Sequence, residues 1–423
     1  MPDGSSTAHI YQPKLLATLS EGYGLDAFRK DVVAALTVAI VALPLSMAIA
    51  VASGVSPERG LYTAIVGGTL VSALGGSRYQ IGGPAGAFIV LVAATVAKFG
   101  LEGLLLTVLL SGAMLTLIGV LRIGMLIRYI PHPVTVGFTA GIAITIAASQ
   151  IKDFTGLTLP HEPGPLLPKL AAIFHVLPTF TPAAAVIGLL SAALILVLRA
   201  FRPTWPGMLI AVLGASIGAA VLHLPVETIA TRFGGIPSGL PSPHLPPISL
   251  ALVWKVLPAA LSFTLLGGIE SLLSAKVADG MTGRKHRSNM ELVAQGVANI
   301  VSALFGGIAV TGTIARTATN IRAGAKSPLS GILHAAFLLA FMLVAAPLAG
   351  YIPLSALAGV LAVVAWNMAE KEAFVHLLTN WRGAAILLAT FVLTLLFDLT
   401  TGIVTGCVLA AAFAGFDRLR PAS

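Results

Sequence analysis

A single arginine lies among glycines and threonines inside an otherwise apolar part of the sequence. The stretch from Gly306 to Lys326 reads GGIAVTGTIARTATNIRAGAK. A fixed charge at bilayer depth is costly, so Arg316 is a candidate functional residue. The glycines and β-branched threonines around it disfavour a long helix. We therefore predict a short half-helix after unwound chain, whose free N–H groups and positive dipole end form an anion site near the membrane midplane.

A second passage, SRYQIGGPAGAFIVL, has the same character. Gly82 and Gly83 precede Pro84, which suits the first turn of a helix. We predict a second half-helix here; the alternative is a plain Gly-Pro loop before a short span. Both passages follow similar motifs, VSALGG from Val71 and VSALFGG from Val301, about 230 residues apart. The two motifs favour an inverted repeat in which the half-helices meet end to end, although a chance match of small-residue runs gives the same pattern.

An isolated carboxylate follows two glycines in the stretch LLGGIESLLSAKVADGMTGRKHRS. Glu270 falls in an apolar helix, where a lone carboxylate tends to be protonated or paired. It could bind a coupling cation, carry a proton or neutralise Arg316. Ser274 lies one turn further along the same face. The structural alternative is a Glu270 to Arg316 ion pair that fixes helix packing.

The composition is that of an integral membrane protein. Of 423 residues, 57% are hydrophobic and 10% are charged, against about 25% charged in ordinary soluble domains. The single cysteine, Cys407, excludes an intramolecular disulfide, and no metal-ligand spacing or cofactor motif is present. The 25 Lys and Arg residues are scattered through loops, which argues against nucleic-acid binding. Because no Ser/His/Asp or His-rich arrangement falls at one depth, a membrane enzyme is disfavoured.

Hydropathy predicts one domain of fourteen spans, some of them short. They cover approximately residues 31–53, 60–75, 84–97, 101–120, 133–150, 182–201, 206–224, 257–278, 288–305, 312–321, 328–349, 353–368, 383–398 and 400–416. Pro44 is expected to break the first span, or else to kink it.

The charges predict that both termini are cytoplasmic. Residues 1–30 are polar and contain no signal peptide. With both ends inside, 18 of the 25 Lys and Arg residues fall in inner loops, as the positive-inside rule requires. Arg316 lies within a span, and the outer loops hold Arg59, Lys98, Lys152, Lys169, Arg232 and Lys255. For a bacterial chain this orientation implies the plasma (inner) membrane.

Five long stretches resemble the SulP family of anion transporters, solute carrier family 26, over nearly the whole chain. They begin DVVAALTVAIVALPLSMAIAVASG at Asp31, IGGPAGA at Ile81, IPHPVTVGFTAGIAI at Ile130, IESLLSAKVADGMTGRKHRS at Ile269 and VTGTIARTATNIRAGAK at Val310. The second half, including VAWNMAE from Val364, is similar to the bacterial dicarboxylate-transporting branch.

The resemblance implies an all-α fold of seven plus seven inverted spans within residues 31–417. A core domain, about 31–120 and 257–349, would move like an elevator against a gate domain, about 130–224 and 353–416. Family members are usually homodimers and continue into a cytoplasmic STAS domain. Here residues 418–423 stand where that domain would follow, as expected for a piece of a longer protein or a short member.

The resemblance also implies a site between the third and tenth spans. Glu270 takes the place of an aspartate found in sodium-coupled bicarbonate members, with Ser274 at a neighbouring ligand position. The longer carboxylate and the hydroxyl-free Ala85 favour a coupling proton over sodium. The implied function is proton-coupled symport of a dicarboxylate such as fumarate or succinate; the alternatives are a sulfate or bicarbonate transporter, or an uncoupled anion channel. The implied anion-binding residues are Ala85, Gly86, Gly312, Thr313, Ile314 and Arg316, with Leu45 and Ile49 on the pocket wall.

Overall fold

The chain folds almost entirely into helices, as its apolar composition predicts. The computed structural model describes residues 11–122, 131–159, 163, 166–397 and 399–419. Among these, seven helices are long and apolar enough to cross a membrane: α2 (Leu25–Ala52), the helical run Gly86–Val120, α7 (His132–Thr155), α9 (Pro182–Phe201), α12 (Leu250–Thr282), α15 (Leu329–Ala349) and the run Leu354–Leu378. An integral membrane protein is therefore confirmed, whereas the count of fourteen inverted spans stays a prediction.

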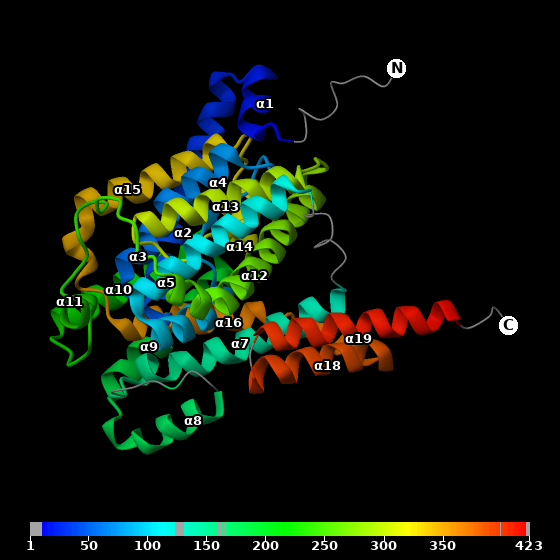
Figure 1. Ribbon diagram of the computed structural model, residues 1–423. Coiled ribbons are helices and arrows are strands. Elements are labelled where there is room, and N and C mark those ends of the chain that lie inside the picture. The colour runs from blue at the N-terminus through cyan, green and yellow to red at the C-terminus, as the bar shows by residue number, and fades with distance from the viewer. Residues whose placement is uncertain (1–10, 123–130, 160–162, 164–165, 398, 420–423) are drawn as a thin grey trace.

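One group of helices packs around α2 and α5 (Ile89–Val120). Helix α5 lies against α12 and α13 (Ser288–Leu304), and α2 lies against α15 and α14 (Ile314–Arg322), as Figure 1 shows. The group is completed by α3 (Pro57–Tyr62), the π-helical turn η2 (Thr63–Gly67) and α4 (Gly68–Leu74).

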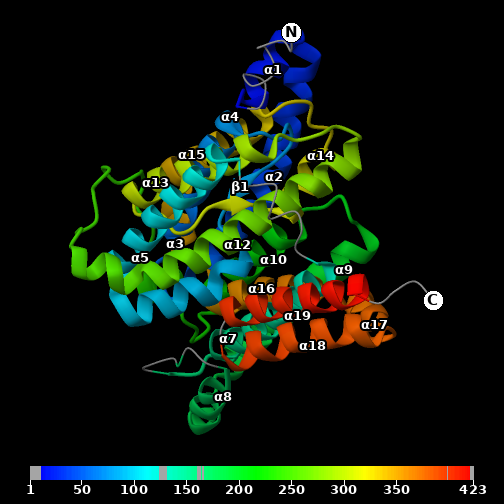
Figure 2. The same cartoon turned by 45° about the vertical axis from the view of Figure 1, so that its right-hand side comes forward.

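A second group packs around α7. Helix α7 contacts α9, α16 (Leu354–Met368), α18 (Trp381–Leu396) and α19 (Leu399–Leu419), and α18 and α19 lie side by side below the first group in Figure 2. The two groups meet where α16 and α10 contact α2. Their division into a moving core and a gate stays a prediction. The remaining helices here are α8 (Leu166–His175), η4 (Leu177–Thr179), α10 (Gly207–Val221), α11 (Ile229–Phe233) and α17 (Lys371–Leu378).

The two predicted helix breaks turned out differently. Gly100 takes a positive φ of 69° with ψ of −175° inside α5, which separates two helical segments where we predicted separate spans. Pro44 does not break α2, so that prediction is wrong. Proline removes one backbone hydrogen bond, and the buried packing on both sides of Pro44 keeps the helix continuous.

A short antiparallel ribbon joins the two glycine-rich passages. Strand β1 (Gly82–Gly83) pairs with β2 (Thr311–Gly312), with Gly82 opposite Gly312. The pairing continues beyond β2, because the Thr313 N–H donates to the Ile81 carbonyl at 3.0 Å. Figure 2 places β1 among α2, α12 and α14. The sequence predicted unwound chain here, and the pairing explains how the unwound backbone is satisfied inside the protein.

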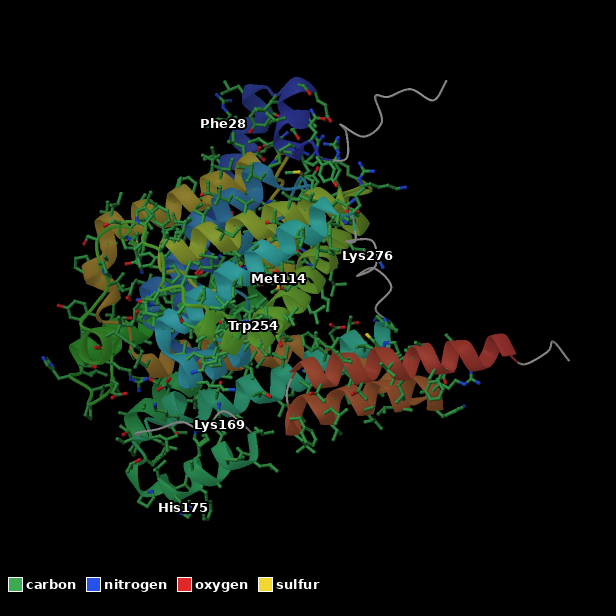
Figure 3. The ribbon with its side chains drawn as sticks, viewed as in Figure 1. Phe28, Met114, Lys169, His175, Trp254 and Lys276 are labelled. Carbon is green, nitrogen blue, oxygen red and sulfur yellow. The ribbon has the colours of Figure 1, made fainter. Side chains whose placement is uncertain are left out.

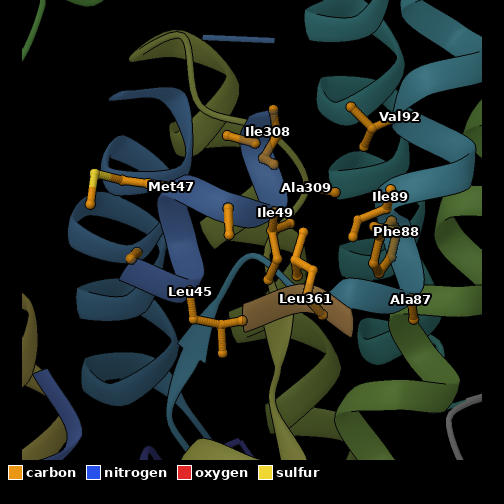
Figure 4. Packing of buried hydrophobic residues seen from close by; sticks show 14 of the residues in the cluster. Leu45, Met47, Ile49, Ala87, Phe88, Ile89, Val92, Ile308, Ala309 and Leu361 are labelled. Carbon is orange, nitrogen blue, oxygen red and sulfur yellow. The ribbon is translucent and has the colours of Figure 1, made fainter. Parts of the chain in front are cut away.

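The main apolar core surrounds this ribbon. Ile49 of α2, Phe88 beside α5 and Leu361 of α16 belong to one buried cluster (Figure 4), so both groups of helices contribute to it. Phe88 also packs on Phe263 of α12, with ring centroids 5.4 Å apart. The ribbon is therefore enclosed by apolar side chains.

The polar segment before α2 is attached to the first group. Glu21, just after α1 (Lys14–Ser20), accepts from Arg78 at 2.6 Å through both carboxylate oxygens. That bond holds the pKa of the Glu21 carboxyl below its ordinary value. Asp31, fully buried at the start of α2, accepts from the Lys326 N–H at 2.6 Å and the Ser327 hydroxyl at 2.5 Å.

Candidate functional site

Two helices begin at opposite ends of the ribbon, and neither start is capped by a side chain. The run through η3 (Gly86–Phe88) into α5 begins after Ala85, and α14 begins after Thr313. Both preceding residues are extended, and the side chain of neither accepts a capping hydrogen bond. The first N–H groups of a helix have no intrahelical acceptor. Both starts can therefore bind an anion through backbone N–H groups.

Within the described residues, Arg316 is a buried cation without a carboxylate partner. Its side chain is 2% exposed, and its Nη2 donates to Ser46 Oγ and to the Pro84 carbonyl, each at 3.2 Å. Its Nε and Nη1 atoms have no hydrogen-bond partner. A Cβ on Gly83 would lie 2.3 Å from Nη1, so the guanidinium packs directly on β1. A buried cation is costly unless an anion compensates it.

The possible ion pair between Glu270 and Arg316 is not formed. Glu270 is 8% exposed on α12, and within the described residues its carboxylate makes no hydrogen bond or ion pair. The structural interpretation of this pair is therefore wrong, because Ser46 of α2 and Pro84 just after β1, rather than α12, supply the hydrogen bonds of Arg316.

Serines of α12 hold β2 and α14 in place. The Gly312 N–H donates to Ser271 Oγ at 3.2 Å, and that hydroxyl also bonds Thr311 Oγ1 at 2.8 Å. Ser274, predicted beside the coupling ion, donates its hydroxyl to Thr317 Oγ1 at 3.2 Å. The structure thus gives Ser274 a contact with α14, and its role toward a coupling ion stays a prediction.

Sequence reasoning missed a buried polar pair that supports the ribbon. Glu291 of α13 is fully buried and accepts from the N–H groups of Gly76 at 2.9 Å and Ser77 at 3.0 Å. It also accepts from Gln80 Nε2 at 2.8 Å. Gln80 in turn contacts the Cα of Gly312, where a Cβ would lie 1.9 Å from Nε2. The signal was present, since Glu291 is the only carboxylate in the predicted span 288–305.

The predicted site residues gather where the two groups of helices meet. Ala85 and Thr313 are each 8% exposed, and Leu45 and Ile49 are 8% and 2% exposed on α2. Figure 4 shows Leu45 and Ile49 beside the ribbon. Gly86 faces the second group. A Cβ there would lie 3.6 Å from Ile146 Cδ1 and 3.9 Å from Met368 Sδ.

Ile314 and Thr313 open α14, and their contacts differ. Ile314 is half-buried in the first turn. The Thr313 hydroxyl donates to the Ile81 carbonyl at 3.2 Å. The backbone N–H groups of this turn, rather than that hydroxyl, are therefore the free donors toward an anion.

Known proteins match most of this chain. The sequence profile of the Sulfate permease family matches residues 28–394. YvdB of Bacillus subtilis, described as a candidate sulfate transporter, is 45% identical over 93% of this chain and 74% of its own length. The bicarbonate transporter BicA of Picosynechococcus is 31% identical over 90% of this chain and 69% of its own.

Solved structures share the fold. The transmembrane domain of a cyanobacterial BicA superposes with a TM-score of 0.82 at 30% identity, covering 90% of this chain and 98% of that domain. SLC26A9 superposes with a TM-score of 0.88 at 20% identity, over 97% of this chain and 69% of its own. This chain therefore belongs to the sulfate permease family and is an integral membrane anion transporter.

Proposed function

We propose that this transporter carries a small oxyanion, sulfate or bicarbonate, bound between the starts of η3 and α14. The observation that carries the proposal is Arg316, a buried cation with two unpaired donor nitrogens and no carboxylate partner within the described residues. An oxyanion would supply the missing charge and accept from the uncapped N–H groups.

The choice of substrate follows the relatives. The resemblance to a dicarboxylate branch led us to expect fumarate or succinate. YvdB is described as a candidate sulfate transporter and BicA as a bicarbonate transporter. These names favour our alternative, so sulfate and bicarbonate rank ahead of dicarboxylates.

Transport would proceed by movement of the first group of helices against the second. Ala85, Gly312, Thr313 and Arg316 all belong to the first group. The second group approaches the site through Ile146 and Met368, which would lie 3.6 and 3.9 Å from a Cβ placed on Gly86. Apolar contacts of this kind can slide without breaking hydrogen bonds. We propose an elevator motion in a homodimer, with both termini cytoplasmic in the plasma membrane.

Glu270 is our candidate for the coupling group. Its carboxylate is buried on α12 with no hydrogen-bond partner among the described residues. A proton bound there would reduce the negative charge near the anion site and so favour anion binding. By reciprocity, the bound anion would favour protonation. Sodium remains the alternative coupling ion.

Uptake into proteoliposomes tests the proposal. Labelled sulfate and labelled bicarbonate are each supplied with an inward proton gradient, an inward sodium gradient or neither, and unlabelled fumarate serves as competitor. Concentrative, saturable uptake of sulfate or bicarbonate with the proton gradient supports both the substrate and the coupling. Uptake that fumarate alone inhibits would restore the dicarboxylate interpretation, and flux that never saturates would favour a channel.

A further inference from the structure

A cavity separate from the candidate site lies between the two groups of helices. It encloses about 340 Å³ between the end of α2, the first turns of α5 and the last turns of α7. Liquid water occupies roughly 30 Å³ per molecule, so the cavity has room for a hydrated oxyanion. None of Ala85, Gly312 and Arg316 lines it. Because α2 begins near α1 and its last residues, Val51 and Ala52, line this cavity, the cavity lies at the end of α2 that is far from α1.

Among the described residues, three cations and one carboxylate, Asp153, line the cavity. Lys152 of α7, Lys169 of α8 (labelled in Figure 3) and Arg232 of α11 all line it. Arg232 is bonded to Asp153 at 2.8 Å and also to Glu227. Within the described residues, the ammonium of Lys152 has no carboxylate partner. Lys152 is therefore the cation that a bound anion would neutralise.

The walls of the cavity lead toward the candidate site. Thr145, Ser149 and Lys152 follow one face of α7, opposite small residues of α5 that include Ala93. Ile146, next to Thr145, comes within 3.6 Å of the position of a Cβ on Gly86. Ile89, the first residue of α5 and three residues after Gly86, also lines the cavity, so the cavity adjoins the run that begins with η3.

We propose that this cavity is a second anion-binding site, in which Lys152 holds a small oxyanion on its way to or from the ribbon. The site deepens the proposed function and rests on it for the identity of the anion. The binding chemistry is a lysine ammonium at the membrane surface, which a free oxyanion and an anionic lipid phosphate can both satisfy.

A cysteine placed in the cavity measures its occupancy directly. Cys407 is the only cysteine, so A93C in a C407S background gives one reporter thiol. Its reaction with neutral N-ethylmaleimide is timed in maltoside micelles, with and without sodium sulfate. We expect saturating sulfate to slow the reaction about fivefold or more, since the bound anion shields the thiol. K255C in the same background is the matched control, because Lys255 is an exposed cation outside the cavity.

Variants identify the residue that binds. When K152Q is added, the sulfate concentration that gives half-maximal protection should rise about tenfold, as the loss of one charge-assisted contact predicts. K152R keeps the positive charge, so sulfate should still protect the thiol. That result would show that a substitution at this position is tolerated. R316Q should also keep the protection, because Arg316 belongs to the other site.

Several results would overturn the proposal. The proposal is wrong if sulfate, bicarbonate and chloride all fail to slow the labelling of the thiol. It is also wrong if sulfate protects the thiol equally well in the K152Q variant, or if R316Q removes the protection. Protection by added phosphatidylglycerol alone would assign the cavity to a lipid and overturn it as well. The labelling rate reports only the occupancy of the cavity. Failure of the proposed function would be seen in a separate assay, as the absence of sulfate and bicarbonate uptake into proteoliposomes.

Discussion

Replacing Gly312 with alanine should destabilise the protein, because the new methyl group has no room. The Cβ would lie 1.9 Å from Gln80 Nε2 and 2.4 Å from Gln80 Cδ. Gln80 cannot move away freely, because its Nε2 donates to Glu291 at 2.8 Å and to the Ser271 carbonyl at 3.2 Å. The substitution therefore has to break buried hydrogen bonds or separate β1 from β2.

The size of the effect follows from these contacts. A lost hydrogen bond to the buried carboxylate of Glu291 costs about 1.5–3 kcal/mol, and overpacking adds about 1–3 kcal/mol. We expect a total of roughly 3–5 kcal/mol in the free energy of unfolding, which lowers the melting temperature on the order of 5 °C or more.

Gly86 supplies the matched control. A methyl group there meets Ile146 and Met368 at 3.6 and 3.9 Å, which are ordinary contacts. G86A should therefore change the free energy of unfolding by less than about 1 kcal/mol, although it adds bulk between the two groups of helices and should slow uptake. The assay is the apparent melting temperature of purified variants in one detergent at one heating rate, because unfolding of membrane proteins is seldom reversible.

Equal melting temperatures for G312A and the parent would refute the packing described around the ribbon. So would a larger loss of stability in G86A than in G312A. Either result would mean that Gln80 is free to move, and that Glu291 does not hold the ribbon in place.

Three further predictions concern ionisable groups. E270Q should abolish the stimulation of sulfate uptake by an inward proton gradient; stimulation equal to that of the parent would exclude Glu270 as the coupling group. D31N should lower the melting temperature, since the Lys326 and Ser327 donors lose a charged acceptor worth about 1.5–3 kcal/mol; an unchanged melting temperature would contradict this. The lowered pKa of Glu21 means that its bond to Arg78 stabilises the fold at neutral pH and is lost as pH falls. The melting temperatures of E21Q and the parent should therefore differ slightly at pH 7 and converge near about pH 3; a gap that persists there would contradict this.

Much of the site could be predicted because unusual residues in an apolar sequence mark it. The half-helix at α14 was predicted from glycines, threonines and Arg316, and the structure has it at Ile314–Arg322. The break before residue 101 was predicted from the spans and lies at Gly100. These features are local, so composition and spacing determine them.

The contacts between distant segments could not be predicted in the same way. The pairing of β1 with β2 brings residues 82–83 next to residues 311–312. No periodic pattern of apolar residues in the sequence indicates a contact of this kind. The support from Gln80 and Glu291 depends on the same long-range approach. The contact of Arg316 with Ser46 was not predicted either, because nothing in the sequence marks one serine of an apolar helix as its partner.

The measurement that tests the account most directly is the kinetics of sulfate uptake by R316Q. If Arg316 binds the anion, kcat/KM should fall about 10–100-fold, the equivalent of one charge-assisted hydrogen bond. The melting temperature should stay at or above that of the parent, because the substitution removes a buried cation that has no carboxylate partner within the described residues. Unchanged kcat/KM in a folded R316Q protein would contradict the central claim that this buried arginine binds the transported anion.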